Sequence, residues 1–159
     1  MVSGDAAVND DARRAEQLAD LVHFVQTIAR QVHTAPLVDP EIVELSQLEG
    51  LTMQFIDRHP GVRAAELATH LGLKHSNASA ALRELDRKGM IRREPDRTDR
   101  RAATIWPTEL AERNLVRMRT HWARLLSPVP ISDADLSATV ATLENVESQL
   151  AHHPVARTL

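Results

Sequence analysis

Residues 62–91 contain two short helical patterns around Gly72, and no other stretch constrains the fold as strongly. The apolar positions recur at the spacing of one helix face, with Leu67, Ala68 and Leu71 before the glycine and Leu82 and Leu85 after it. Two short helices around a tight turn are therefore predicted. This is the helix-turn-helix pattern, in which the second helix presents its N-terminal polar residues outward. A generic αα-hairpin would have the same pattern.

The residues that follow favour the first of these alternatives. The stretches "GMIRRE" and "RAATIW" bracket the polar turn "PDRTD" and predict two strands joined by a long basic tip. Helix, turn, helix and hairpin in this order predict a winged helix.

Two helices are predicted before this region. Apolar residues from 10 to 32 recur at three and four residues and predict an amphipathic helix. Asp39 and Pro40 then resemble the N-cap and first turn of a second helix. Its apolar stripe consists of Ile42, Leu45, Leu48, Leu51, Phe55 and Ile56. Gly50 lowers helix propensity by about 1 kcal/mol, so this segment is predicted as one helix or two shorter ones.

Two further helices are predicted after the hairpin. Thr108 is a suitable N-cap for a helix that carries Leu110, Leu115, Met118, Trp122, Leu125 and Leu126. Ser132 and Asp135 resemble a capping box that opens the last helix. In that helix Leu136, Val140, Leu143, Val146 and Leu150 are spaced 4, 3, 3 and 4, which predicts a narrow apolar seam.

Composition excludes several classes of protein. The chain has no cysteine, which rules out disulfides, zinc–cysteine sites and thiol redox sensing. No apolar run approaches the roughly 20 residues of a membrane helix. The N-terminal stretch is too acidic and polar for a signal peptide, so we expect a cytoplasmic protein.

Charge is concentrated in the middle of the chain. Residues 58–101 contain 11 Lys or Arg against 6 Asp or Glu, a local charge of +5, which leaves −8 for the other residues. A basic segment in an acidic chain indicates an anionic partner at that segment. The alternative is a solvated basic surface.

The segment from 60 to 108 resembles the MarR family of bacterial transcription regulators. The family's wing motif is Asp-x-x-Asp-x-Arg, followed by alternating apolar residues and a Thr that caps the next helix. The residues Asp96, Asp99, Arg101 and Thr108 match this motif. The other predicted helices match the family only in number, length and order.

The resemblance implies a mainly α fold with a small β-hairpin wing, in which N- and C-terminal helices form a homodimer. Three parts are then expected: an N-terminal arm and dimerisation helix at 1–38, a winged helix-turn-helix DNA-binding lobe at 39–108, and a long linker helix with a C-terminal dimerisation helix at 109–159. The expected function is that of a dimeric repressor on a pseudo-palindromic double-stranded DNA site. The amphipathic terminal helices agree with dimerisation, because neither has an obvious partner in so small a domain. The alternative is that they fold back on their own core.

The second helix of the motif, which starts near His75, is then expected in the major groove. Its candidate DNA-contacting residues are His75, Ser76, Asn77, Ser79 and Arg83. Asn77 can form two hydrogen bonds with adenine. Many family members have a long basic residue where this chain has Ala80, so fewer base contacts are expected. Lys74 occupies a position where a Ser or Thr cap is common, and it is a candidate phosphate contact.

The wing is expected in the adjacent minor groove. Arg97, Arg100 and Arg101 are the candidate contacts there, because negative potential is deepest where that groove is narrow. Asp99 is expected to orient Arg101 through charge-assisted hydrogen bonds. Arg92 and Arg93 alternate across a strand, so one is a candidate phosphate contact while the other pairs within the protein, with Glu94 or Asp86.

Other functions have less support from the sequence. Met118, His121 and Trp122 form a candidate effector pocket, with ordinary core packing as the alternative. Metal sensing would need His23 with His33, or His152 with His153, and neither pair has suitable spacing within one helix. No catalytic motif is found, so neither an enzyme nor a cofactor is expected. The alternative function is a winged-helix module that binds protein instead of DNA.

Overall fold

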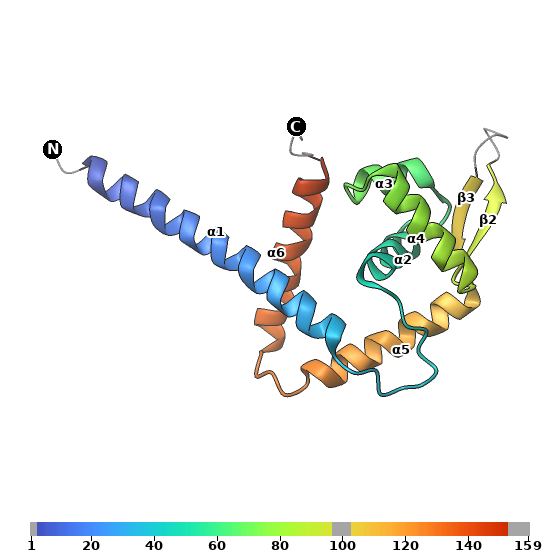
Figure 1. The fold of residues 1–159 in the computed structure, drawn as a ribbon. Helices are drawn as coiled ribbons and strands as arrows, with labels where there is room; N and C mark the ends of the chain where they lie inside the picture. The colour runs from blue at the N-terminus through green and yellow to red at the C-terminus, as the bar shows by residue number, and fades with distance from the viewer. Residues whose placement is uncertain (1–2, 97–102, 153–159) are drawn as a thin grey trace. The chain divides into compact units, whose positions relative to one another are not determined.

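The computed structural model describes residues 3–96 and 103–152, which form helices and one small sheet (Figure 1). The helices are α1 Ser3–Thr34, α2 Gln47–Arg58, α3 Ala64–His70, α4 His75–Arg87, α5 Glu109–Leu126 and α6 Asp133–His152. The strands are β1 Val62–Arg63, β2 Ile91–Pro95 and β3 Ala103–Pro107. The prediction of a mainly helical chain with a winged helix-turn-helix is confirmed. The chain divides into two compact units, Met1–Leu37 and Val38–Leu159.

The first unit consists mainly of α1, which is longer than the helix predicted for 10–32. Its apolar stripe is exposed in the single chain, and it includes Leu18, Val22, Phe24, Val25 and Ile28. Neither α1 nor any other described helix combines the length and apolar character needed to cross a bilayer.

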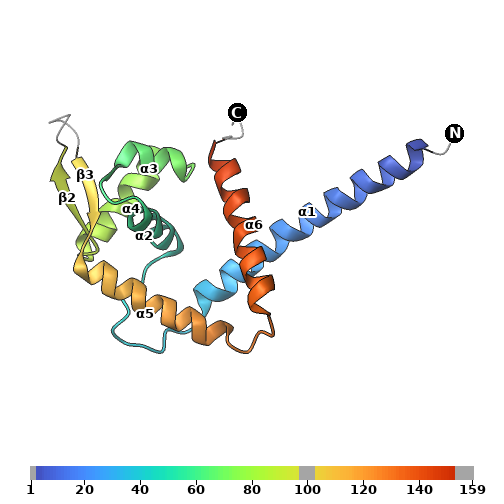
Figure 2. The ribbon, with the colours of Figure 1, turned by 180° about the vertical axis from the view of Figure 1, so that it is seen from behind.

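The sheet of the second unit is antiparallel with strand order β1-β3-β2. Ile91 pairs with Pro107 and Pro95 with Ala103, as expected for the predicted hairpin, and Figure 2 shows this hairpin beside α4. Strand β1, which was not predicted, adds Val62 opposite Ile105. The core lies between the sheet and α2, α3 and α4, and its most buried large side chains are Ile56, Leu67, Leu82, Leu85, Met90 and Ile105.

The predicted start of the second helix is wrong. Helix α2 begins after Ser46, whose hydroxyl accepts a hydrogen bond from the Glu49 N–H, while the Glu49 carboxylate accepts one from the Ser46 N–H. Asp39 instead accepts a hydrogen bond from the Glu41 N–H in a turn. That bond and a second one from Arg117 lower the pKa of Asp39. Gly50 lies inside one uninterrupted helix.

Helix α5 holds the segment that precedes α2. The side-chain amide of Asn114, which is 4% exposed, accepts a hydrogen bond from the Val43 N–H at 2.8 Å and donates to the Val43 carbonyl at 3.2 Å. Arg117 pairs with Asp39 at 2.8 Å and also with Glu41. The Asn114 bonds satisfy the Val43 N–H and carbonyl, which no helix or strand satisfies, and together with the Arg117 ion pairs they fix the path of the chain into α2.

A partly buried ion pair joins α2 to the C-terminal end of α4. The Lys88 ammonium donates to Glu49 Oε2 at 2.6 Å and to the Glu44 carbonyl at 2.8 Å. Burial by itself would raise the pKa of Glu49, but hydrogen bonds from Lys88 and from the Ser46 N–H outweigh it, and the pKa lies below its ordinary value. Since the folded state favours the ionised carboxyl, Glu49 stabilises the fold above its ordinary pKa of 4.5, and this contribution is lost as the pH falls through the lower folded value.

Replacing Glu49 with Gln should lower the free energy of unfolding at pH 7 by about 1–3 kcal/mol, because Lys88 loses a charged partner. The variant should also lose less stability than wild type as the pH falls below 4.5. Urea unfolding at a series of pH values measures both effects. Glu112→Gln, on the exposed side of α5, is the control. An equal acid-induced loss of stability in the wild-type and Glu49→Gln proteins would contradict the assignment.

Gly61 permits a close approach between the start of β1 and the wing. Its φ is +84°, and its N–H donates to the Ile105 carbonyl at 2.8 Å. A Cβ atom at this position would lie 2.9 Å from Trp106 Cζ2. Both the backbone conformation and the indole ring therefore require glycine here.

We expect Gly61→Ala to lower the free energy of unfolding by roughly 1–3 kcal/mol. Gly50→Ala is the matched control, because no atom lies within 4 Å of its added Cβ. In the interior of α2 this change should stabilise the protein by about 0.5–1 kcal/mol. Thermal or urea unfolding of the two variants checks the prediction, which fails if both change stability in the same direction.

Candidate nucleic-acid interface

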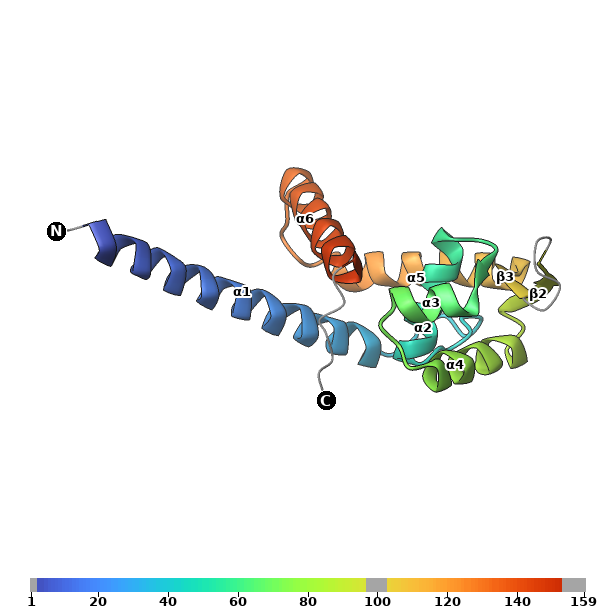
Figure 3. The ribbon, with the colours of Figure 1, turned by 90° about the horizontal axis from the view of Figure 1, so that it is seen from above.

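Helix α4 separates core residues from candidate contact residues along its length. Its buried residues are Ala78, Ala81, Leu82 and Leu85. The five residues that the sequence assigns to the groove are all exposed: His75, Ser76, Asn77, Ser79 and Arg83. Figure 3 shows α4 at the edge of the second unit, with α2 and α3 along one side of it. The three- and four-residue spacing of the buried positions leaves the polar residues in solvent.

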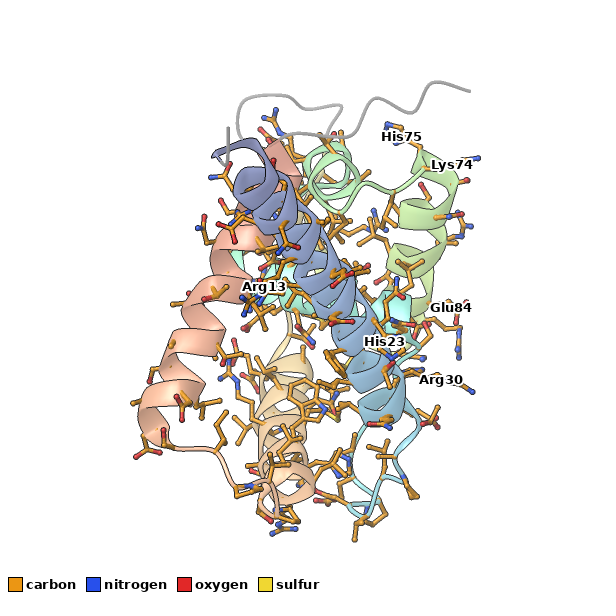
Figure 4. All side chains as sticks on the ribbon, turned by 90° about the vertical axis from the view of Figure 1, so that its left-hand side faces the viewer. Arg13, His23, Arg30, Lys74, His75 and Glu84 are labelled. Carbon is orange, nitrogen blue, oxygen red and sulfur yellow. The ribbon has the colours of Figure 1, made fainter. Side chains whose placement is uncertain are left out.

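The N-terminal end of α4 presents a cation and an imidazole to solvent. Lys74 is the N-cap residue, with φ −66° and ψ 144°, and its side chain makes no capping hydrogen bond. In Figure 4 Lys74 and His75 point outward from the start of the helix, and Glu84 lies further along it. The helix dipole and the Lys74 ammonium both favour an anion at this end.

Two arginines of α4 differ in their surroundings. The Arg87 guanidinium pairs with Glu84 at 2.7 Å. Arg83 is exposed and has no ion-pair partner within residues 3–96 and 103–152. Arg83 is therefore the better placed of the two to meet a phosphate or a base.

Arg92 and Arg93 both pair within the protein. Arg92 pairs with Glu94, and its guanidinium carbon lies 5.4 Å from the centroid of the Trp106 ring. Arg93 pairs with Asp86 at 3.8 Å. Both acidic partners named from the sequence are thus used, one by each arginine. Each arginine keeps more than a third of its side chain exposed, so a phosphate contact by either stays a prediction.

The predicted wing contacts Arg97, Asp99, Arg100 and Arg101 lie outside the described residues. Asp96, directly before this segment, is buried and accepts a hydrogen bond from Arg63 Nε at 2.6 Å. Sequence reasoning missed Arg63. The signal that could have identified it is its position at the N-cap of α3. Residues preferred at an N-cap accept a hydrogen bond through the side chain, and an arginine side chain cannot do so.

The candidate effector residues Met118, His121 and Trp122 lie on α5, and each is half-buried. The Nε2 atom of His121 is buried and makes no hydrogen bond within the described part of the chain. A separate open cavity of about 180 Å³ lies between α2, α3 and α6, with Phe55, His59 and His70 in its lining, and the three α5 residues do not line it. An effector pocket at Met118 stays a prediction.

The metal hypotheses receive no support from the described residues. Within them, no group of three or more His, Cys, Asp or Glu side chains is arranged to hold a metal ion. His153 lies outside the described residues, as does the side chain of His152.

The sequence of this chain is similar to those of known transcriptional regulators. The MarR family profile matches residues 45–102, which include α2 to β2. The uncharacterized HTH-type transcriptional regulator YybA of Bacillus subtilis (strain 168) is 23% identical over 90 residues. That match covers 57% of this chain and 60% of the relative's length.

Solved structures described as MarR-family regulators share the fold of this chain. A MarR-family regulator from Rhodococcus sp. RHA1 superposes with a TM-score of 0.64 and 21% identity, over 84% of this chain and 94% of that one. A MarR-family regulator from Listeria monocytogenes, solved with a 26mer DNA, gives a TM-score of 0.61 and 17% identity, over 82% and 89% of the two chains. At these identities the likeness establishes the fold.

Lys74 gives the first test of the α4 surface. Lys74→Ser supplies a capping hydroxyl and should raise the free energy of unfolding by about 0.5–2 kcal/mol. It should also reduce the salt dependence of DNA binding by about one phosphate contact. Lys74→Ala removes the charge without adding a cap, so it should share the DNA effect and be less stable than Lys74→Ser. DNA titrations at several salt concentrations measure how steeply the affinity falls with salt. If this slope is the same in both variants as in wild type, Lys74 does not bind phosphate.

Proposed function

Because this chain belongs to the MarR family of DNA-binding transcriptional regulators, we propose that it acts as a homodimeric repressor on a pseudo-palindromic operator. The single observation that carries the proposal is the exposed polar side of α4. The apolar side of the same helix is buried in the core. The family consists of regulators and not of enzymes, in agreement with the sequence prediction.

In this proposal α4 enters the major groove. Asn77 is exposed in the first turn of α4 and can hydrogen-bond both polar atoms of an adenine edge. Lys74 and Arg83 would meet phosphates or bases at the two ends of the same surface. Ala80 is also exposed on this helix, and its small side chain supports close approach of the helix to the DNA.

The wing would contact the adjacent minor groove. The proposal assigns Arg97, Arg100 and Arg101 to this contact, with Asp99 orienting Arg101. The support is the concentration of positive charge in residues 58–101, together with the hairpin register that brings Pro95 opposite Ala103. Arginine in a narrow minor groove is favoured by the negative potential there.

Dimerisation would use the terminal helices. On α1, Leu18 and Ile28 are 51% and 53% exposed, and on α6, Leu136 and Leu150 are 48% and 63% exposed. Apolar surface of this extent is costly in water and favours association. We propose that residues 1–38 and 109–159 supply the dimer surface and that 39–108 supply the DNA-binding lobe. The protein would act in the bacterial cytoplasm, where the chromosome lies, and a small-molecule effector would release it from DNA.

The test is a titration of purified protein against DNA from upstream of its own coding sequence, at several salt concentrations. One dimer should bind each site, and affinity should fall with salt because phosphate contacts release counterions. Replacing Arg97, Arg100 and Arg101 together with alanine should abolish tight binding, while the protein remains a folded dimer.

A matched variant controls for total charge. Replacing Arg13, Arg14 and Arg30 of α1 with alanine removes the same charge outside the proposed DNA-binding lobe, and light scattering checks that this variant is still a dimer. If upstream DNA does not bind, genome-wide selection tests other sequences. A folded dimer that selects no DNA sequence would refute the proposal and favour a winged helix that binds protein.

A further inference from the structure

We propose that Arg63 is a positioning residue for the wing, which it holds through Asp96 at the end of β2. This inference rests on the proposed DNA-binding function and adds a residue that lies outside the groove helix and the wing. The bond is short, with Arg63 Nε 2.6 Å from Asp96 Oδ2. The Asp96 side chain is 7% exposed, and that of Arg63 is 40% exposed.

The pair joins two parts of the sheet that do not hydrogen-bond to each other. Arg63 lies in β1, Asp96 directly follows β2, and β3 lies between these two strands. The backbone ladder connects each outer strand only to β3. The ion pair is therefore a direct connection from one edge of the sheet to the other.

Helix formation does not explain an arginine at this position. Residue 63 is the N-cap of α3, with φ −85° and ψ 149°. Ser, Thr, Asp and Asn stabilise this position because their side chains accept a hydrogen bond from the first turn, whereas a guanidinium only donates. Glu66 accepts a hydrogen bond from the Arg63 N–H at 3.1 Å, but the Arg63 side chain itself makes no cap. Its contact with Asp96 uses the charged donor that a capping residue would not supply.

The position of Asp96 makes this contact relevant to DNA binding. It is the last described residue before the segment 97–102, which contains three of the proposed DNA-contacting arginines. A buried carboxylate requires a charged or hydrogen-bonding partner. By holding Asp96 against β1, Arg63 fixes the point at which the chain leaves the sheet. Fixing this point before DNA arrives lowers the ordering cost of binding.

Two substitutions of Arg63 separate positioning from stability. Arg63→Ala removes the ion pair and adds no cap, whereas Arg63→Thr removes the same pair and adds a capping hydroxyl. The Thr variant should have a higher melting temperature than the Ala variant. Both should bind operator DNA about tenfold more weakly than wild type, a typical size for coupled residues. If Arg63→Thr regains wild-type affinity along with its stability, the effect is one of stability alone and the inference is overturned.

A double-mutant cycle tests whether Arg63 acts through the wing. Arg63→Thr is combined with the triple alanine variant of Arg97, Arg100 and Arg101, on an operator that retains measurable affinity at low salt. The Arg63 effect should largely disappear in the triple background. Arg117→Ala is the control, because Arg117 is similarly exposed and also ion-paired but holds the segment before α2. If the fold-losses in DNA affinity of the two separate variants multiply in the combined variant, Arg63 does not act through the wing.

Hydrogen exchange of the DNA-free protein gives a readout that does not depend on the proposed function. In Arg63→Thr the amides of β2 and β3 should exchange faster than in wild type, while those of α2 and α4 keep their rates. Arg117→Ala should leave the hairpin unchanged. If wild type binds no DNA sequence, the proposed function fails, and hairpin exchange alone then decides the inference. Equal exchange in wild type and Arg63→Thr overturns it.

Discussion

The packing of α4 into the core is the interaction on which the rest of the structure depends. Leu82 and Leu85 are almost completely buried, and they set the rotation of α4 about its axis and its distance from the core. A rotation by one residue, about 100°, would bury polar groups and expose leucine. The exposed side is therefore determined by the buried side, and the protein can vary the groove residues without changing the core.

Three polar contacts fix the elements around α4, and each joins residues far apart in the sequence. Lys88 binds Glu49, Asn114 binds the backbone at Val43, and Arg63 binds Asp96. Hydrophobic burial supplies most of the driving force for folding but is not directional. Hydrogen-bonded contacts of this kind specify one arrangement of the helices, because each carries a large penalty if its buried partner is left unsatisfied.

Local signals predicted most of the fold, and its failures have both local and long-range causes. Helix α4, the hairpin and the Thr108 cap follow from apolar spacing and capping chemistry within a few residues. The predicted start at Asp39 is wrong because Ser46 and Glu49 form a capping box at the start of α2, and Asp39 accepts the Glu41 N–H in a turn instead. Strand β1 has only two residues, too few for a periodic pattern. The exposure of the α4 candidates was predictable from the helix period, but the pairing of Arg63 with Asp96 was not, since it depends on strand order.

The most direct test of the account uses the absence of cysteine from the chain. A single cysteine at Ser79 can carry a DNA-cleaving iron chelate, and a second protein with the label at Ser137 on α6 is the control. If α4 of each subunit lies in the major groove, the Ser79 label will cleave the operator in two clusters, one per half-site, about 10 base pairs apart. Binding without cleavage from Ser79, or the same cleavage from Ser137, would contradict the account.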